Sequence, residues 1–470
     1  MPPKLSPVLF GSPLLTHKVV FCASVFVALS LTGCASIQLA QPITGPTVTV
    51  PTQWHESIAT SQDHADNQWW KAFGIHELDE LIRTALESNK DISIATSRLE
   101  QARALTSQAE AERRPQINAE AGSQRGRSSS LDPKTQSSSV GLRASWEVDL
   151  FNRGGLKIDA SESEAQAAQH SLEAVKVALA ADVATAYFDL HALTQRVELG
   201  HQACRVAERQ LKVAQYKMVA GQATALDVEL MRSELAQEQA AVSQLEGFRR
   251  IRYRQLALLL GKSVPPALSM ANIGEPPTSP ALHLPGELLE RRPDVLRQAR
   301  ALDAALARVG IARKEIYPSL RIEWSRARER MSVDGGQAST QVVLGYGVAL
   351  SLPILDGGRI RSNIQIQEAR AKEAMGEYEK SMLTALTEAE SALAQWSASE
   401  NVIGEMRKAE TAAHTSTNHA ERMYGAGLND QSVVLASQRN YLRIEDSLRQ
   451  AEANRWTAAI MLRRVFAGTI

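Results

Sequence analysis

The residues that could do chemistry are few, and a single cysteine stands out among them. The chain has three cysteines, Cys22, Cys34 and Cys204, which are too few and too widely spaced for a disulfide framework or a zinc site. Its 10 histidines show no H-E-x-x-H spacing, and no G-x-S-x-G motif or phosphate-binding loop occurs. We therefore expect no catalytic residues, no metal site and no cofactor. The chemistry that the sequence does support is the modification of Cys34.

Cys34 lies at the end of a segment typical of a lipoprotein signal. A basic start and an apolar run from Val19 to Leu31 lead into Leu31-Thr32-Gly33-Cys34, which reads as a secretory signal followed by a lipobox. Cleavage before Cys34 would leave it as an N-terminal, acylated residue whose chains enter a bilayer leaflet. Ala35 follows, and the absence of Asp at that position favours the outer membrane over the inner one. The alternative is an ordinary signal peptide with a chance cysteine.

The composition indicates long helices rather than a compact enzyme core. Lys+Arg and Asp+Glu both number 52, so no net charge attracts nucleic acid. Aromatic residues make up only 5% of the chain, while Ala, Gln, Glu, Leu, Arg and Ser recur through long stretches. No run after the signal is long and apolar enough for a transmembrane helix, so we expect strands to make any membrane crossing.

The chain repeats itself once, with a nearly constant spacing. Pro115 matches Pro318 at an offset of 203 (318 − 115), and the pairs Asp91 with Asp294 and Gly154-Gly155 with Gly357-Gly358 share that offset. Gly221 and Gly427 follow at 206 (427 − 221). Each half reads as helix, strand, strand, long helix, turn, helix, so we expect a mainly α fold with a small β part, built from this duplicated unit.

The repeat fixes the predicted boundaries. We expect a signal peptide over 1–33, an N-terminal extension over 34–74, a first structural repeat over 75–261, a Pro-rich linker over 262–285 and a second repeat over 286–467. One helix should run from Ile75 to Glu112. Strands are expected at about 115–127, 138–150, 318–327 and 340–352, and helical hairpins at about 152–261 and 357–466.

The predicted strands have one apolar face, and this face suggests how the chain assembles. Val140, Leu142, Ala144, Trp146, Val148 and Leu150 alternate without a break against small or polar residues. Open sheet edges would leave backbone donors unsatisfied in hydrocarbon, so closure requires further copies. Three copies would supply twelve strands, enough for an outer-membrane barrel with Trp146 and Trp324 toward lipid.

The helices after the second strands are too long for a compact domain. About 65 residues of uninterrupted helix extend roughly 100 Å. Gly221 and Gly427 should reverse the chain at the hairpin tips, since a left-handed position favours glycine. Aromatic residues at helical positions are expected to pack rather than bind a substrate, namely Tyr187, Phe188, Tyr253, Trp396 and Trp456.

These residues together resemble the TolC-like outer-membrane efflux family, especially its OprM-like, NodT-type lipoprotein branch in RND efflux systems. The resemblance covers almost everything after Cys34. It rests on the lipobox, on Trp69-Trp70-Lys71-Ala72-Phe73, on Leu289-Glu290-Arg291-Arg292-Pro293-Asp294 and on the duplicated strand and tip patterns. It implies a homotrimer anchored in outer-membrane lipid, with a barrel continuous with a periplasmic helical tunnel. It also implies a periplasmic adaptor and an inner-membrane RND-type pump as partners, with no nucleic acid.

The same resemblance places a periplasmic gate at the second hairpin tip. The corresponding positions here are Arg422, Tyr424, Leu428, Asn429 and Asp430, while Gly221 and Gly427 mark tips that should face the adaptor. The family often has an acid directly after the Gly-apolar pair, where this chain has Asn429. An inward Asp430 would give a ring of three carboxylates. The alternative is that Asp430 only caps the next helix.

Other classes of protein fit less well. The favoured function is a passive exit duct for small molecules such as drugs or other toxic compounds, without enzyme activity. The outer-membrane component of a type I protein secretion system is the alternative within that class. A structural coiled-coil protein of the envelope would not need four alternating strands. A periplasmic adaptor would have one helical hairpin, whereas this chain has two.

Overall fold

The computed structural model describes residues 45–56, 60–64, 68–127, 133–264, 266–269, 273–277 and 279–467. The predicted signal peptide and Cys34 lie outside the described residues. Pro46–Ile470 form one compact unit. Among the helices of the described ranges, none combines the length and the apolar character that a bilayer-spanning helix requires.

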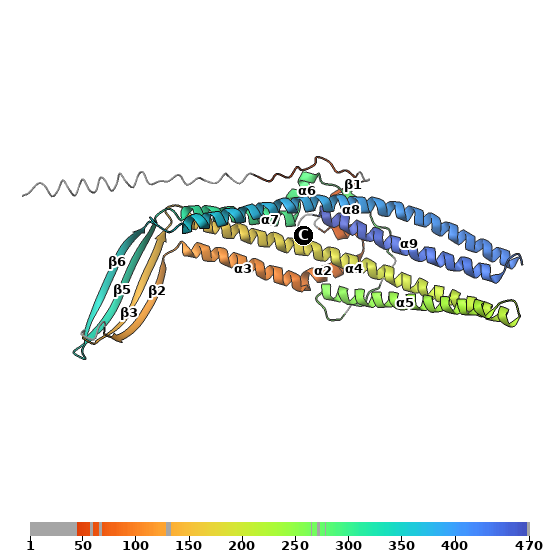
Figure 1. Cartoon of the computed structure of the whole chain (residues 1–470), viewed down its shortest axis with the longest axis horizontal. Coiled ribbons are helices and arrows are strands. Elements are labelled where there is room, and N and C mark those ends of the chain that lie inside the picture. The colour runs from red at the N-terminus through yellow and green to blue at the C-terminus, as the bar shows by residue number, and fades with distance from the viewer. Residues whose placement is uncertain are drawn as a thin grey trace, which may run out of the picture. The chain divides into compact units, whose positions relative to one another are not determined.

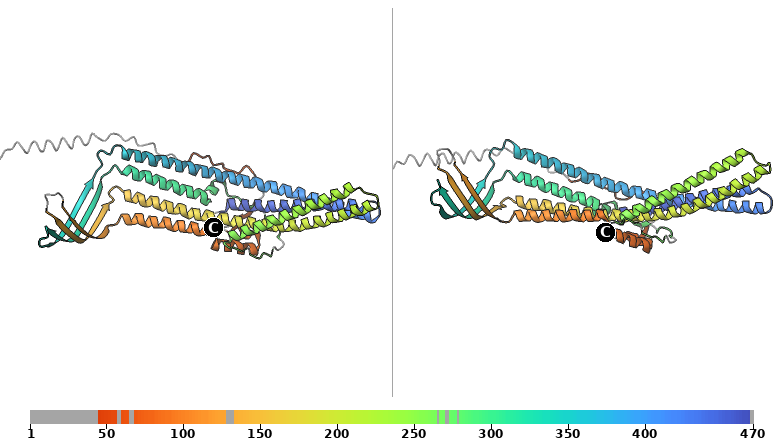
Figure 2. Two further views of the ribbon diagram at one scale, coloured as in Figure 1. Left: turned by 60° about the horizontal axis from the view of Figure 1, so that its bottom comes forward. Right: turned by 90° about the horizontal axis from the view of Figure 1, so that it is seen from below.

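A four-stranded antiparallel sheet joins the two halves of the chain (Figure 1). It consists of β2 (Gln116–Gly126), β3 (Thr135–Val148), β5 (Ser319–Val333) and β6 (Ser339–Ser351), in the order β2-β3-β5-β6. The central pair is the long-range one, with Thr135 opposite Val333 and Val148 opposite Leu320. Figure 2 shows the strands crossing as the sheet twists. Strands β2 and β6 form the two edges of this sheet, which no other strand of the described chain covers.

One strand is longer than its apolar pattern predicts. The sequence places the end of the third strand at about residue 327, but β5 continues to Val333. Along β5 the apolar residues Leu320, Ile322 and Trp324 give way to arginines on the same face. The hydrophobic alternation ends there although the backbone pairing does not, because the main-chain hydrogen bonds do not depend on the side chain.

Two helical hairpins extend from the other side of the sheet. The first is α4 (Arg153–Val219) with α5 (Ala225–Leu259), and the second is α8 (Arg359–Gly425) with α9 (Gln431–Phe466). Helices α4 and α8 have 67 residues each, which at 1.5 Å per residue is about 100 Å. Both hairpin tips lie at the end of the helices far from the sheet (Figures 1 and 2).

The helix predicted from Ile75 to Glu112 is in fact two helices. Helix α2 (His76–Ser88) ends at Asn89, and α3 (Lys90–Glu112) begins after it. The Asn89 side chain accepts hydrogen bonds from the backbone N–H groups of Asp91 (2.7 Å) and Ile92 (3.3 Å), and it donates to the Leu259 carbonyl (2.9 Å). Capping and the contact with α5 together stop the first helix.

The second repeat has its break at the matching position. Helix α6 (Pro285–Arg291) and α7 (Pro293–Lys314) are separated by Arg292, which lies 203 residues after Asn89 (292 − 89). The Arg292 guanidinium donates to Asp294 (2.7 Å) and to Glu388 of α8 (2.6 Å). Both breaks therefore fix the short helices to a helix of the adjacent hairpin.

The strand-to-helix turns differ from one another in how they cap. Asn152 directly precedes α4, but it adopts a left-handed conformation (φ 58°) and its side chain makes no capping bond. Asp149 accepts the Gly155 N–H instead (2.9 Å). In the second half Asp356 does cap, accepting the N–H groups of Gly358 (3.0 Å) and Ile360 (2.8 Å). A side chain three residues upstream can replace the local cap because the turn is tight.

The segments outside the repeats complete a core at mid-length of the helices. A 3₁₀ helix, η1 (Trp69–Phe73), packs its aromatic rings against α4 and α9, where Phe188 stacks on Trp456 with ring centroids 4.0 Å apart. Strands β1 (Thr60–His64) and β4 (Ser279–Ala281) pair in parallel, which joins the predicted extension and the linker. The packing predicted for aromatic residues is confirmed for those that are buried, namely Tyr187, Phe188, Trp396 and Trp456. Tyr253 is half-buried and donates to the Pro266 carbonyl (2.5 Å).

Candidate functional site

The first hairpin tip is a glycine-terminated helix followed by a capping box. Gly221 has φ +72°, and the Gln222 N–H donates back to the Lys217 carbonyl (2.7 Å). Thr224 then caps α5, with its hydroxyl accepting the Asp227 N–H (3.3 Å) and Asp227 accepting the Thr224 N–H (2.7 Å). This is the reciprocal arrangement that satisfies two orphan donors of a helix start.

The second tip repeats this geometry with a different cap. Gly427 also has φ +72°, and the Leu428 N–H donates to the Met423 carbonyl (2.8 Å). Asp430 takes the place that Thr224 has in the first tip, and its Oδ1 accepts the Ser432 N–H (2.9 Å). Both tips thus use glycine for the left-handed residue and a short polar side chain to begin the returning helix.

Asp430 also joins the two hairpins. Its Oδ2 accepts a hydrogen bond from the Lys217 ammonium of α4 at 2.6 Å. The bond from Lys217, together with the Ser432 N–H, lowers the pKa of Asp430 to about 2. Asp430 therefore caps α9, and its carboxylate is paired with Lys217 within this protomer. Its part in a gate stays a prediction.

The other predicted gate residues lie around the same tip. Asn429 donates from Nδ2 to the Ala420 carbonyl (3.1 Å), while its Oδ1 is buried without a partner among the described residues. Arg422, Tyr424 and Leu428 are exposed, Leu428 with 71% of its surface accessible. Their role in a gate stays a prediction, but the fold does bring them together at one end of α8.

Further ion pairs run along the seam between the hairpins. Arg196 of α4 makes a two-point contact with Asp446 of α9 at 2.7 and 3.1 Å. Nearer the tip, Arg439 of α9 pairs with Glu234 of α5. Sequence reasoning missed this seam because the register of one hairpin on the other leaves no local pattern. Any motion of the second hairpin away from the first must break these pairs.

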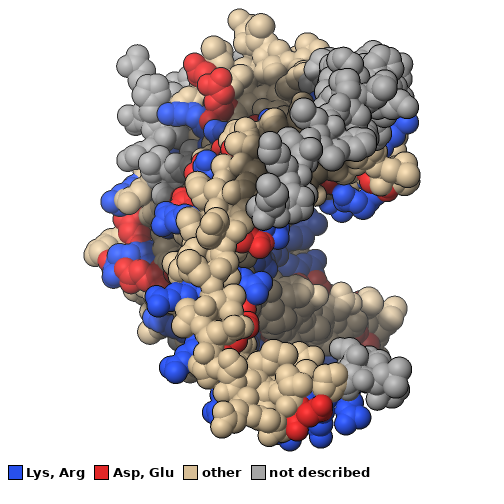
Figure 3. Space-filling model, turned by 90° about the vertical axis from the view of Figure 1, so that its left-hand side faces the viewer, with Lys and Arg blue, Asp and Glu red and all other residues tan. Residues whose placement is uncertain are grey.

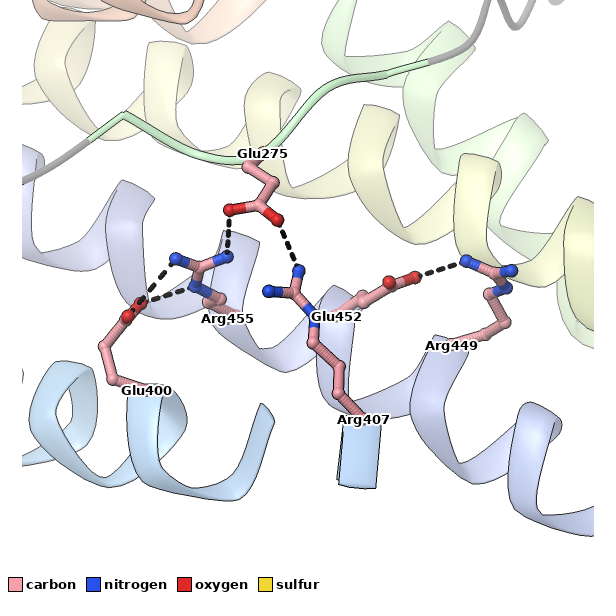
Figure 4. A network of polar contacts seen from close by, with 6 residues as sticks. All are labelled: Glu275, Glu400, Arg407, Arg449, Glu452 and Arg455. Atoms are coloured by element: carbon pink, nitrogen blue, oxygen red, sulfur yellow. Dashed lines mark hydrogen bonds and ion pairs between the residues drawn. The ribbon is translucent and has the colours of Figure 1, made fainter. Parts of the chain in front are cut away.

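The linker is bound to the second hairpin through a charged network (Figure 4). Glu275 accepts hydrogen bonds from Arg407 of α8 (2.5 Å) and Arg455 of α9 (3.4 Å), and the bond from Arg407 lowers the pKa of Glu275. Arg455 also pairs with Glu400 of α8 and lies over the Trp396 ring at 5.9 Å. The linker therefore joins α8 and α9 through ion pairs at mid-length of the two helices.

The sheet presents an exposed apolar face. Several of its side chains are accessible over most of their surface, among them Tyr346 (85%) and Val348 (70%). Trp146 and Trp324 lie on this face and are 37% and 39% exposed. An apolar face of this size is typical of a surface that another molecule or a membrane covers. Within the described ranges no three His, Cys, Asp or Glu residues lie close enough together to hold a metal ion.

Comparison with known proteins assigns the family. Over residues 81–262 and 284–468 the chain matches the family model described as outer membrane efflux protein. The chain belongs to this family. The two matched segments bracket the linker, as expected for a duplicated unit. Family membership sets aside the adaptor and the structural coiled-coil hypotheses, and the family is one of transport proteins.

Individual relatives agree over nearly the whole length. The pyoverdine export outer membrane protein OpmQ of Pseudomonas aeruginosa is 29% identical over 438 residues, covering 89% of this chain and 91% of OpmQ. The outer membrane protein OprJ of the same organism is 30% identical over 468 residues, covering 95% of each. The open-state MtrE outer membrane channel of Neisseria gonorrhoeae shares the fold, with a TM-score of 0.79 at 22% identity, over 91% of this chain and 97% of MtrE.

The family defines what the chain does in outline. It is an outer-membrane protein whose helical part lies in the periplasm, and it serves as the exit duct of an efflux system. The fold class predicted from the sequence, a TolC-like duplicated unit of helices with a small antiparallel sheet, is confirmed.

Proposed function

We propose that three copies of this chain form a closed duct that passively exports small molecules. The observation that supports this most strongly is the four-stranded sheet, whose two edge strands, β2 and β6, lack a neighbour within the described chain and whose one face is apolar and exposed. Joining β2 of one copy to β6 of the next leaves no free edge. Twelve strands then make the barrel, and the hairpins below it make the tunnel.

The tips provide the surface for a periplasmic adaptor. Apolar side chains are exposed around both turns, including Tyr216 (75%), Val219 (85%) and Leu226 (67%) on the first hairpin and Leu428 (71%) on the second. Monomeric surfaces rarely group so many apolar side chains without a partner. Gly221 and Gly427 set the shape of this surface, and an inner-membrane RND-type pump supplies the energy.

The gate in this proposal is a change of helix packing at the tip. Arg422, Tyr424, Leu428 and Asn429 line the narrowest part, and the Lys217–Asp430 pair holds the second hairpin against the first in the closed state. Opening moves α8 and α9 outward as a unit, because the linker and the Arg455–Glu400 contact keep these two helices together.

The cargo class is small molecules, with protein secretion of the type I kind as the alternative. The relative OpmQ is named for the export of pyoverdine, and by analogy this favours small molecules as the cargo of the present chain. The lipid anchor at Cys34 fits the same assignment. Incorporation of radiolabelled palmitate should occur in the wild type and vanish in Cys34→Ala, and labelling that persists would exclude Cys34 as the acylated residue.

The proposed assembly is tested by the mass of the purified protein. Native mass spectrometry in detergent should give three times the mass of the mature chain, since fewer copies cannot close the sheet. A monomer or dimer that is stable after extraction would contradict the duct. A trimer without channel activity would leave the assembly intact and refute the gating scheme.

A further inference from the structure

The exposed face of the sheet has a charged end that its apolar pattern does not explain. The strand register places Arg326, Arg328 and Arg330 of β5 on the same face as Trp146, Trp324 and the exposed apolar residues of β6. Arg326 lies between Leu142 and Leu344, and Arg328 between Val140 and Val342. All three arginines are exposed.

The two faces of the sheet distribute charge very differently. The face opposite the arginines mixes both signs, with Glu120 bound to Arg143 (3.3 Å) and Glu147 near Arg321 (4.0 Å). The arginine face carries no acidic side chain among the described residues of the four strands. Its fourth basic residue, Arg125, donates to the neutral Gln136 (2.6 Å). Arg326, Arg328 and Arg330 have no ion-pair partner in the described part of the chain.

The arginines gather at the end of the sheet that is far from the helices. Strand β5 begins beside α7 at Ser319 and ends at Val333, so Arg330 is near the far end while Trp146 and Trp324 are near the helices. Figure 3 views the chain from this end and shows basic and acidic side chains set among uncharged ones. With helices in the periplasm, the far end of the sheet points away from the cell.

Simple geometry puts the arginines at the outer edge of the membrane. The strand length from Leu320 to Arg330 is about 34 Å, and at a tilt of about 40° this length spans about 26 Å along the membrane normal. The apolar band of an outer-membrane barrel is about 25 Å tall. On the same geometry Arg328 lies about 4 Å and Arg326 about 9 Å inside that edge, and their long side chains extend the guanidinium groups toward it. An adjacent protomer does not cover them, because β5 is an inner strand between β3 and β6.

We propose that Arg326, Arg328 and Arg330 form a binding site for the phosphate groups of an anionic glycolipid in the outer leaflet, with its acyl chains on the apolar residues of β3 and β6. Guanidinium groups bind phosphate through paired N–H donors, and the apolar side chains beside them are already positioned for acyl chains. The inference rests on the proposed trimeric duct, which gives three such sites.

The site is tested with purified full-length trimers and lipid A as the probe. Native mass spectrometry would measure bound lipid A for the wild type, for a variant combining Arg326→Gln, Arg328→Gln and Arg330→Gln, and for Arg321→Gln as a control on the opposite face. Three surface charges lost should weaken binding about 100-fold. The control should bind as the wild type does. A variant combining Arg326→Lys, Arg328→Lys and Arg330→Lys should bind more weakly than the wild type but more tightly than the triple Gln variant, because lysine keeps the charge and loses the paired donors.

Two further ligands identify the source of the phosphate. Monophosphoryl lipid A should bind more weakly than the bisphosphorylated form, and millimolar inorganic phosphate should not compete, because it lacks acyl chains. Unchanged binding in the triple Gln variant, equal loss in Arg321→Gln, or efficient competition by inorganic phosphate would overturn the proposal. If the triple variant fails to assemble, Arg328→Gln alone should still lose about fivefold.

Different experimental results would refute the proposed trimeric assembly and the proposed lipid site. A wild-type trimer that conducts ions but binds lipid A regardless of the arginines would refute the lipid site and leave the duct standing. A wild-type chain that neither trimerises nor conducts would refute both.

Discussion

Removing the charge of Asp430 should open the tip about ten times more often. Asp430 accepts one bond from the Ser432 N–H within its own hairpin and one from Lys217 of the other hairpin. Asp430→Asn keeps the cap, since Asn caps as well as Asp, but it removes the ion pair. Asp430→Ala removes both. Comparing the two variants separates closure of the gate from stability of α9.

The size of the effect follows from the exposure of the pair. The Lys217 and Asp430 side chains are 31% and 49% exposed, so solvent screens the pair and its worth is about 0.5 kcal/mol. Three pairs that break together in a trimer amount to about 1.5 kcal/mol, or about tenfold in the open-to-closed ratio. In Asp430→Ala the lost cap also lowers the free energy of unfolding by about 1 kcal/mol per chain. It does not change the open-to-closed ratio, because the cap lies within one hairpin.

Single-channel recording in planar bilayers measures the open probability directly. The open probability should rise about tenfold in each of the variants Asp430→Asn, Asp430→Ala and Lys217→Gln. In the double variant that combines Lys217→Gln with Asp430→Asn it should rise no further, as expected for one shared interaction. Asp227→Asn is the matched control, because Asp227 bonds only to Thr224 of its own tip. An open probability within twofold of wild type in Asp430→Asn, or an additive double variant, would show that the Lys217–Asp430 pair does not hold the tip closed.

Other predictions concern the same elements. Asp430 has a pKa of about 2 against an ordinary 3.8. Its contribution to closure is therefore complete above about pH 4 and is lost as the pH falls toward 2. Single-channel currents at pH 7 and pH 5 should agree, and the current should rise at pH 3. Glu275→Gln should lower the free energy of unfolding by about 0.5 kcal/mol in a urea titration, because Arg407 loses its partner. The control Glu405→Gln should change this free energy little. Equal effects of the two variants would contradict the proposed role of Glu275 in joining α8 and α9. Gly427→Val should cost about 1–2 kcal/mol in thermal unfolding because φ is +72°, and Gly427→Asn less; equal melting of both variants would contradict the left-handed turn.

The sequence was sufficient for elements with a strong internal period. Strand β3 alternates from Val140 to Val148, and α4 and α8 run for 67 residues without a proline, so their type and position follow from local pattern. Gly221 and Gly427 were recognisable because each ends a long helix, and their positive φ agrees with the expected turn. The offset of 203 between the halves then carried each assignment from one half to the other.

The features that the sequence did not reveal depend on contacts between distant segments. The break at Asn89 uses a carbonyl of α5, although its alignment with Arg292, directly before Pro293, was a usable signal. The far part of β5 was missed because arginine replaces apolar residues on the same face. The Lys217–Asp430 pair joins residues 213 apart, and nothing in the local sequence of either specifies the other.

The decisive test of a gated trimeric duct is the single-channel current of the purified wild-type protein in a planar bilayer. A trimeric duct closed at its tip should give discrete, small currents that grow when the Lys217–Asp430 pair is removed. A protein that inserts into the bilayer as a trimer and yet passes no current, in the wild type and in Asp430→Asn alike, would contradict the proposal that the two hairpins and the sheet enclose one continuous path.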